Sequence, residues 1–263
     1  MRTKIGNVHN RHKVSFSQQV VDLIRISDIV LEILDARLLQ ESRIPEMERE
    51  VIDQGKILIH VINKVDLLPR GEIPKMEGLS NPILISAKSR QGISKLREKI
   101  RIMASRFKDH PQVHVGVVGY PNTGKSSLLN LLARHAAAPV SSQPGFTKGI
   151  RKIRLAKGVL LLDAPGVIPK NENLFTETDR IKYGLMGVHT PENIKDPDLV
   201  VNQLMKLYPE KLEKYYGISD FGDVELLLEK IGKKFNIVKK GAEIDVDRVA
   251  RRVLKDWHTG KIR

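Results

Sequence analysis

The sequence contains no cysteine and few aromatic residues, and each shortage excludes a class of function. With 0 Cys in 263 residues, a disulfide scaffold, a thiolate nucleophile, a zinc–thiolate centre and an iron–sulfur cluster are excluded. Aromatic residues make up only 5% of the chain, which argues against a platform for stacking nucleic-acid bases. No apolar run approaches the ~18 residues needed to cross a bilayer, and the amino-terminal residues lack the apolar core of a secretory signal. We therefore expect a cytoplasmic protein with no membrane contact.

Positive charge, in contrast, is present in excess. The chain has 45 Lys and Arg against 31 Asp and Glu, which gives a formal net charge of +14. Such an imbalance favours a polyanionic partner, most often a nucleic acid. Hydrophobic residues make up 41% of the chain, enough for a sizeable buried core, so disorder throughout is excluded.

Over its first two thirds the chain alternates short apolar runs with stretches of helical periodicity. This alternation predicts an α/β fold, with a mainly parallel sheet covered by helices on both faces. The predicted strands are residues 29–34, 57–62, 83–85, 113–118 and 159–162. The predicted helices are residues 20–26, 44–54, 93–107 and a segment ending at 132.

Beyond residue 172 the pattern changes to helices alone. These are predicted over residues 178–186, 198–207, 224–235 and 246–257. Asp245 is a suitable N-cap for the last helix, and Gly260 is a suitable stop after it. We therefore expect an α/β domain over residues 1–172, with a basic arm at 1–17, and a small all-α domain over residues 173–263.

A phosphate-binding loop stands between a predicted strand and a predicted helix. The segment Gly119-Tyr-Pro-Asn-Thr-Gly-Lys-Ser126 matches the pattern G-x-x-x-x-G-K-[ST] in full. Its glycines let successive backbone N–H groups wrap around a phosphate chain. Lys125 would reach the β- and γ-phosphates, and the Ser126 hydroxyl would bind Mg²⁺. The residues predicted to contact the phosphates are Pro121, Asn122, Thr123, Gly124, Lys125, Ser126 and Ser127.

Two further segments indicate that the base is guanine. Asn63-Lys-Val-Asp66 follows a predicted strand, and the Asp66 carboxylate can accept hydrogen bonds from both N1–H and the N2 amine of guanine. Adenine lacks these donors and would leave Asp66 unpaired. Asn63 would position the loop, and the stem of Lys64 would cover the base. A third strand is followed by Ser86, Ala87 and Lys88, whose backbone N–H groups are placed to bind the guanine O6.

The last predicted segments concern Mg²⁺ and the γ-phosphate. Asp163 ends a strand and begins Asp-Ala-Pro-Gly166. Asp163 would hold Mg²⁺ through a water, and the Gly166 N–H would sense the γ-phosphate. Thr147, in Pro-Gly-Phe-Thr, would complete the Mg²⁺ shell. The water-orienting glutamine found after Asp-x-x-Gly in many GTPases is replaced by Val167, so intrinsic hydrolysis should be slow.

These elements are those of a GTPase, but their order along the chain is rotated, since the guanine segments precede the phosphate loop. The chain resembles the circularly permuted YlqF/RbgA family of ribosome-assembly GTPases. The residues that carry the resemblance are Asp35-Ala-Arg37, Asn63 to Asp66, Ser86 to Lys88, Gly119 to Ser127, Pro144 to Thr147, Asp163 to Gly166 and Arg248 to Lys261. The resemblance implies a P-loop GTPase domain in permuted order and a small all-α C-terminal domain.

The same resemblance implies a monomeric factor that binds and hydrolyses GTP, with nucleotide state controlling its binding to a large-subunit precursor and its rRNA. It suggests a water-positioning histidine near the N-terminus, where the chain has His9 and His12, and His12 is at the equivalent position. Where the family commonly has Pro-Gly-His, this chain has Asn10-Arg11-His12. His12 could instead contact RNA as part of a basic arm. The segment with Asn122 resembles the phosphate loops of GTPases that use K⁺ near the phosphates.

A second function stays open at this point. An RNA-binding assembly factor could bind GTP structurally with negligible turnover, and Val167 is compatible with that alternative. Lys and Arg recur in the N-terminal arm and in segments 95–108, 148–154 and 230–261. Arg248, Arg251, Arg252 and Lys255 share one helical face. We expect this charge to meet rRNA phosphates in a salt-dependent manner.

Overall fold

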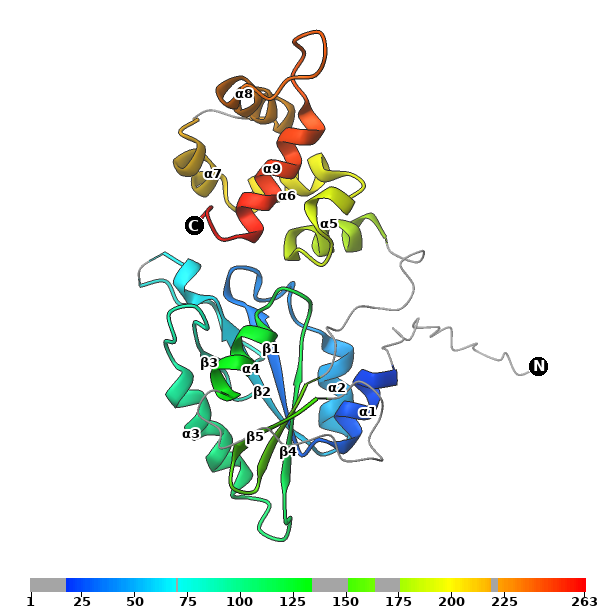
Figure 1. The fold of residues 1–263 in the computed structure, drawn as a ribbon, viewed down its shortest axis with the longest axis vertical. Coiled ribbons are helices and arrows are strands. Elements are labelled where there is room, and N and C mark those ends of the chain that lie inside the picture. The colour runs from blue at the N-terminus through cyan, green and yellow to red at the C-terminus, as the bar shows by residue number, and fades with distance from the viewer. Residues whose placement is uncertain (1–17, 70, 134–150, 164–175, 219–221) are drawn as a thin grey trace, which may run out of the picture.

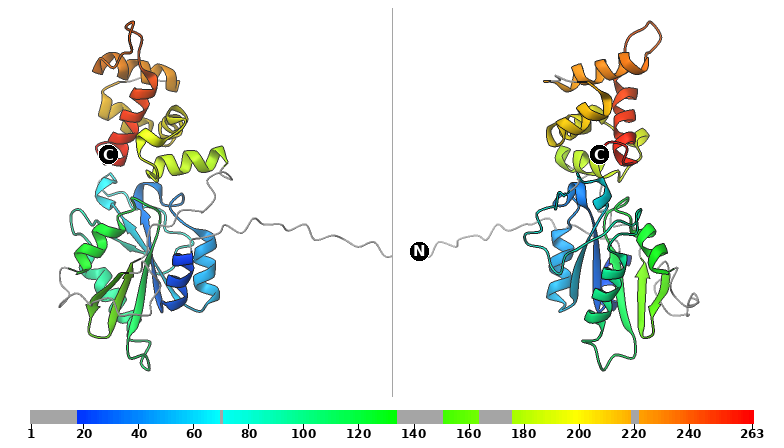
Figure 2. Two further views of the ribbon diagram at one scale, coloured as in Figure 1. Left: turned by 45° about the vertical axis from the view of Figure 1, so that its right-hand side comes forward. Right: turned by 90° about the vertical axis from the view of Figure 1, so that its left-hand side faces the viewer.

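A computed structural model describes residues 18–69, 71–133, 151–163, 176–218 and 222–263. Two regions are evident in it (Figure 1). One is a sheet flanked by helices, and the other is a group of helices formed by the C-terminal part of the chain. Two further views show the helical region standing against one end of the sheet (Figure 2). In the described part, no helix is long and apolar enough to cross a membrane.

The sheet has six strands in the order β3-β2-β1-β4-β6-β5. Every neighbouring pair is parallel except β5 and β6, which are antiparallel. The strands are β1 (Ile29–Asp35), β2 (Ile57–Asn63), β3 (Ile83–Leu84), β4 (Val113–Val118), β5 (Arg151–Ala156) and β6 (Val159–Asp163). The register pairs Asp35 with Asn63 at the ends of β1 and β2, which brings their polar side chains to one edge.

Both faces of the sheet are covered by helices because its central strands are apolar on both sides. All seven residues of β1 are buried. Ile29, Leu31 and Ile33 pack in the cluster that includes residues of α3 and α4, whereas Val30 packs with residues of α1 and α2. Figure 1 shows these two pairs on opposite sides of the sheet. The helices are α1 (Gln18–Ile26), α2 (Pro45–Asp53), α3 (Ile93–Ala104) and α4 (Lys125–Ala133).

The C-terminal region contains five α-helices, whose buried apolar residues belong to the same cluster as those of α1 and α2. They are α5 (Glu177–Met186), α6 (Pro197–Leu207), α7 (Pro209–Tyr216), α8 (Val224–Phe235) and α9 (Val246–His258). Asp245 caps α9 as predicted, because its side chain accepts a hydrogen bond from the Arg248 N–H. Gly260 has φ +71° just beyond the helix, a left-handed conformation that glycine adopts at low cost after a helix.

The predicted fold class is confirmed: a mainly parallel α/β sheet with a helical C-terminal region. One strand and one α-helix were not predicted from the sequence. The antiparallel edge strand β5 begins with two basic residues and is six residues long, and α7 is only eight residues long. The domain limits at residues 172 and 173 lie in a segment outside the described residues and stay predictions.

Candidate nucleotide-binding site

The phosphate loop joins β4 to α4 and requires glycine at two positions. Gly119 has φ +140°, and a Cβ there would lie 2.6 Å from the Ile33 carbonyl oxygen. Gly124 has φ +100°, and a Cβ there would lie 2.1 Å from Asn63 Nδ2. Both distances are below van der Waals contact. The loop is therefore shaped by close packing against β1 and against the segment predicted to bind guanine.

Lys125 begins α4 and is buried within the loop. Its Nζ donates a hydrogen bond to the Tyr120 carbonyl at 2.6 Å, and the Thr123 hydroxyl donates to the same oxygen at 2.9 Å. Burial lowers the pKa of Lys125 to about 8, although the charge of Asp163 opposes the shift. The lysine is thus held among backbone groups at the start of a helix, where an anion would also be stabilised.

Two of the three residues expected to bind Mg²⁺, Ser126 and Asp163, lie near this lysine. Asp163 ends β6 and pairs in register with Val117 of β4, next to the loop. Ser126 and Ser127 are exposed at the first turn of α4. A carboxylate and a hydroxyl beside a phosphate loop are the donors that Mg²⁺ takes together with phosphate oxygens. The residues present therefore fit that ion.

Asn63 connects the segments predicted to bind the base and the phosphates. Its Nδ2 donates to the Thr123 carbonyl at 2.8 Å, and its Oδ1 accepts from the Ala87 N–H at 2.9 Å. The buried Ser86 hydroxyl donates to Asp66 Oδ1 at 2.6 Å. Asn63 is 2% exposed, so both of its bonds are shielded from water. One asparagine thus joins three segments that are far apart in sequence.

A cavity of about 360 Å³ opens where these segments meet. Its volume falls in the usual range for small-molecule sites, about 300–1,000 Å³. The predicted nucleotide residues that line it are Asn63, Lys64, Asp66, Ala87, Lys88, Gly124 and Ser127. Three further lining residues come from the end of α9 and were not predicted: His258, Thr259 and Gly260. The remaining one is Leu67.

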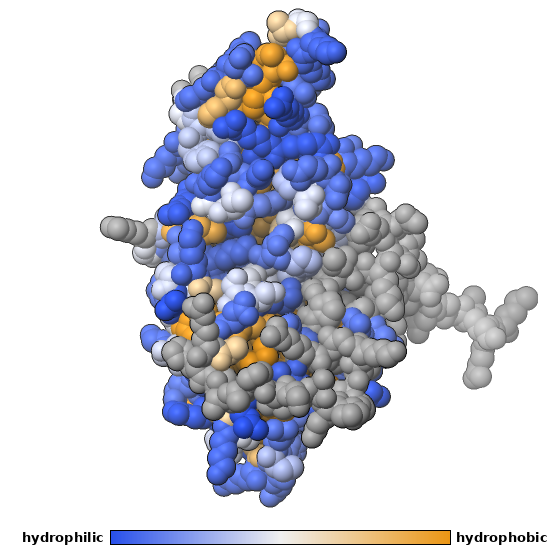
Figure 3. Space-filling view, in the orientation of Figure 1, coloured by the Kyte–Doolittle hydropathy of each residue, from blue (hydrophilic) through white to orange (hydrophobic). Residues whose placement is uncertain are grey.

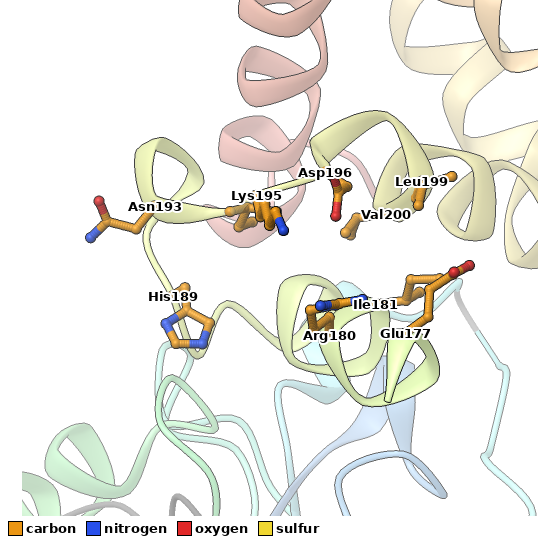
Figure 4. A pocket seen from close by; sticks show the side chains of 10 residues that line it. Glu177, Arg180, Ile181, His189, Asn193, Lys195, Asp196, Leu199 and Val200 are labelled. Atoms are coloured by element: carbon orange, nitrogen blue, oxygen red, sulfur yellow. The ribbon is translucent and has the colours of Figure 1, made fainter. Parts of the chain in front are cut away.

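A larger cavity, of about 450 Å³, lies within the helical region (Figure 4). Arg180 and Glu177 of α5 face Asp196 and Leu199 across it, and His189 stands to one side. Its lining mixes both signs of charge and includes none of the predicted nucleotide-binding residues. The smaller cavity is therefore the candidate nucleotide site, because it combines residues of the guanine and phosphate segments.

Asp35 and Arg37 form an ion-pair network beside the smaller cavity. Asp35 Oδ2 lies 2.9 Å from Arg37 Nη2 and 2.8 Å from Lys64 Nζ. Burial alone would raise the pKa of Asp35, but the charges of Arg37 and Lys64 hold it well below its usual range. In the sequence, Asp35 and Arg37 contribute only to the family resemblance. Their position at the end of a buried strand was the signal that could have placed them at the site.

Not every predicted site residue can be located. His12, Thr147 and Gly166 lie outside the described residues, as does Val167. Asn122 is described: it is exposed, has φ +60°, and its side-chain amide donates a hydrogen bond to the Gly187 carbonyl. This bond ties the phosphate loop to the end of α5 and leaves the side-chain oxygen of Asn122 for another partner.

The fold and the site define a P-loop protein of the GTPase class, with its motifs in circularly permuted order. Residues 114–216 match the family described as 50S ribosome-binding GTPase. The chain is 35% identical over 254 residues to an uncharacterized GTP-binding protein of Methanocaldococcus jannaschii, with 95% of this chain and 66% of that protein covered. It is 31% identical to a guanine nucleotide-binding protein-like 3 homolog of Caenorhabditis elegans, with 99% of this chain and 51% of that protein covered.

Solved structures agree with these sequence matches. GNP-bound YlqF from T. maritima superposes with a TM-score of 0.63 at 26% identity, covering 92% of this chain and 93% of that one. GDP-bound YlqF gives a TM-score of 0.62 at 25% identity. The chain belongs to the YlqF family of circularly permuted GTP-binding proteins. It spans about half the length of its curated C. elegans relative and 66% of its M. jannaschii relative.

Proposed function

We propose that the protein is a GTP-hydrolysing assembly factor for the large ribosomal subunit, and that its nucleotide state controls its binding to the particle and its release. The observation that carries the proposal is the cavity in which Asp66, Lys88 and Ser127 meet. Asp66 is half-buried and accepts one bond from Ser86. Its remaining acceptor capacity suits the two donors of guanine. Ser127 lies at the phosphate end of the same cavity.

The proposed ions follow from the phosphate end of the site. Ser126, Thr147 and Asp163 would hold Mg²⁺, which would neutralise charge on the β- and γ-phosphates. Lys125 would bind the same phosphates, and the Gly166 N–H would sense the γ-phosphate. The side-chain oxygen of Asn122 would contribute to a K⁺ site.

We propose that hydrolysis is slow until the ribosomal particle stimulates it. Val167 has no group that could orient a water, and His12 is the proposed substitute. Within the proposed domains, residues 1–172 would bind the nucleotide and residues 173–263 would contact the particle.

The proposed contact with rRNA rests on the basic surface of the helical region. Hydrophilic side chains cover most of this region on the face seen in Figure 3, with an apolar cluster near its outer end. On α9, Arg248 and Lys255 are exposed. Arg251 instead donates to the Ile194 carbonyl and pairs with Asp247, and Arg252 lies over the Phe235 ring. Arg248 and Lys255 are thus the residues of this face best placed to meet phosphates.

Large-subunit particles provide the test of this function. GTP turnover is measured with and without purified particles, and the protein is sedimented with them in GDP and in a non-hydrolysable GTP analogue. We expect turnover to rise with particles and sedimentation to depend on the nucleotide. The pair Arg248→Ala and Lys255→Ala should weaken sedimentation and reduce its salt dependence. Turnover that stays negligible with particles would favour the alternative, an RNA-binding factor that holds GTP structurally.

A further inference from the structure

The end of the last helix forms one wall of the candidate base pocket. His258, Thr259 and Gly260 line the cavity together with Asp66 and Lys88. Gly260 also packs closely on the residue after Asp66, since a Cβ at Gly260 would lie 3.0 Å from Leu67 Cδ2. The helical region and the guanine-recognition segment are therefore in direct contact.

Arg37 fixes the end of α9 against the sheet. Its Nη1 donates to the Trp257 carbonyl at 2.8 Å, and its guanidinium carbon lies 4.1 Å from the centre of the Trp257 ring. The same carbonyl also accepts from the Gly260 N–H at 3.0 Å, and a cation at the last turn of a helix complements the helix dipole. The side chain of Arg37 is only 3% exposed, so water does not compete for these contacts.

Trp257 is itself held rigidly. Its indole N–H donates to the Leu185 carbonyl at 2.9 Å, and its ring stacks on Tyr208 with centroids 5.3 Å apart. The next residue, His258, is bonded through Nε2 to the Gly184 carbonyl oxygen at 2.7 Å. The wall of the cavity is thus anchored both to the sheet and to α5.

A single carboxylate connects this anchor to the guanine segment. Asp35 binds Arg37 with both oxygens, at 3.1 Å to Nε and 2.9 Å to Nη2. The same Asp35 Oδ2 accepts from Lys64 Nζ at 2.8 Å. Lys64 lines the cavity, so a shift of its side chain toward a base would alter the pairing that holds Arg37 and Trp257.

We propose that the α9 terminus, residues 258–260, is a binding wall for the guanosine part of the nucleotide, and that Asp35 and Arg37 are the residues that position it. The inference rests on the proposed guanine-nucleotide binding and extends it. Because the wall faces the base side of the cavity, GDP and GTP engage it alike. The helical region then senses occupancy of the base pocket, in addition to any response to the γ-phosphate.

The test uses the full chain and one built-in probe, since Trp257 is its single tryptophan. Binding of GDP and of a non-hydrolysable GTP analogue is followed by Trp257 emission, and by displacement of a fluorescent GDP. In the wild type, both nucleotides should change the emission to the same extent. Thr259→Phe adds bulk at an exposed wall position and should weaken binding of both nucleotides about tenfold.

Two matched controls and a second variant complete the design. Thr178→Phe adds the same bulk at an exposed position of α5, and Arg49→Ala removes an exposed arginine of α2; both should bind as the wild type does. Arg37→Ala should weaken both nucleotides about tenfold, the loss expected for a charge-assisted hydrogen bond. If circular dichroism shows that Arg37→Ala does not fold, the affinity of Thr259→Phe alone tests the inference.

Three outcomes would overturn the inference. The first is nucleotide binding by Thr259→Phe as tight as that of the wild type. The second is a Trp257 emission that responds to neither nucleotide, or to the GTP analogue alone, while displacement shows that both bind. The third is a wild type that binds no guanine nucleotide, which would refute the proposed function together with the inference.

Discussion

Asp35 offers the sharpest prediction about stability, because its one carboxylate pairs with two cations, one buried and one partly buried. Its side chain is 6% exposed, that of Arg37 is 3% exposed and that of Lys64 is 20% exposed. Replacing Asp35 by Asn keeps the shape and one acceptor oxygen but removes the charge. Arg37 and Lys64 then repel each other in a site with little access to water. Loss of one partner of a buried ion pair costs about 3–5 kcal/mol.

Asn retains a hydrogen-bond acceptor, so we expect the lower end of this range for Asp35→Asn, about 3 kcal/mol. For a chain of this size, that corresponds to a fall in Tm of roughly 6 to 12 °C. Urea unfolding and calorimetry measure the two quantities. Glu46→Gln is the matched control: Glu46 lies 3.7 Å from exposed Arg49, and such surface pairs contribute about 0–1 kcal/mol. If Asp35→Asn is no less stable than Glu46→Gln, the network does not stabilise the fold as described.

Three further predictions concern other charged and polar groups. His60 lies 3.1 Å from Glu32 and 3.4 Å from Glu48; burial alone would lower its pKa, but these carboxylates raise it to about 9. The contribution of protonated His60 to stability is therefore complete below the ordinary pKa of 6.5 and is lost as the pH rises through 9. Urea unfolding should show that the free energy of unfolding of the wild type falls between pH 7 and 10, and that His60→Gln lacks this fall. Lys125→Met should weaken binding of GDP and GTP about 10- to 100-fold, whereas Lys95→Met at an exposed position of α3 should not; equal affinities would remove Lys125 from the phosphate site. GTP turnover should be faster in K⁺ than in Na⁺ buffer, and Asn122→Ala should abolish the difference; equal wild-type rates in the two salts would refute the K⁺ site.

Local patterns in the sequence predicted most of the fold. Buried runs such as 29–34 gave strands because a parallel sheet covered on both faces requires apolar side chains on both sides. The N-cap at Asp245 followed from residue type alone. Strand β5 was missed because it begins with two basic residues and alternates over too few positions, Ile153 and Leu155 being its only large apolar residues. Helix α7 was missed because two turns give too short a pattern to identify.

In the candidate site, too, some residues could be predicted from motifs and others could not. Asp66, Lys125 and Asn63 were predicted because their motifs follow strands, and the structure brings their segments together. The wall formed by α9 could not be predicted, because Arg37 and Trp257 are 220 residues apart and neither belongs to a motif with a known ligand. Contacts of that kind depend on how the helical region packs against the sheet, which no local pattern specifies.

The central claim is that this cavity binds guanine nucleotides through Asp66. Competition binding is its most direct test. A fluorescent GDP is displaced from the wild type and from Asp66→Ala by GDP, GTP or ATP in the presence of Mg²⁺. GDP and GTP should displace it from the wild type at least about a thousandfold better than ATP, since adenine would leave Asp66 unpaired. Asp66→Ala should lose most of this preference. Displacement by ATP as effective as that by GTP, or an unchanged preference in Asp66→Ala, would contradict the account.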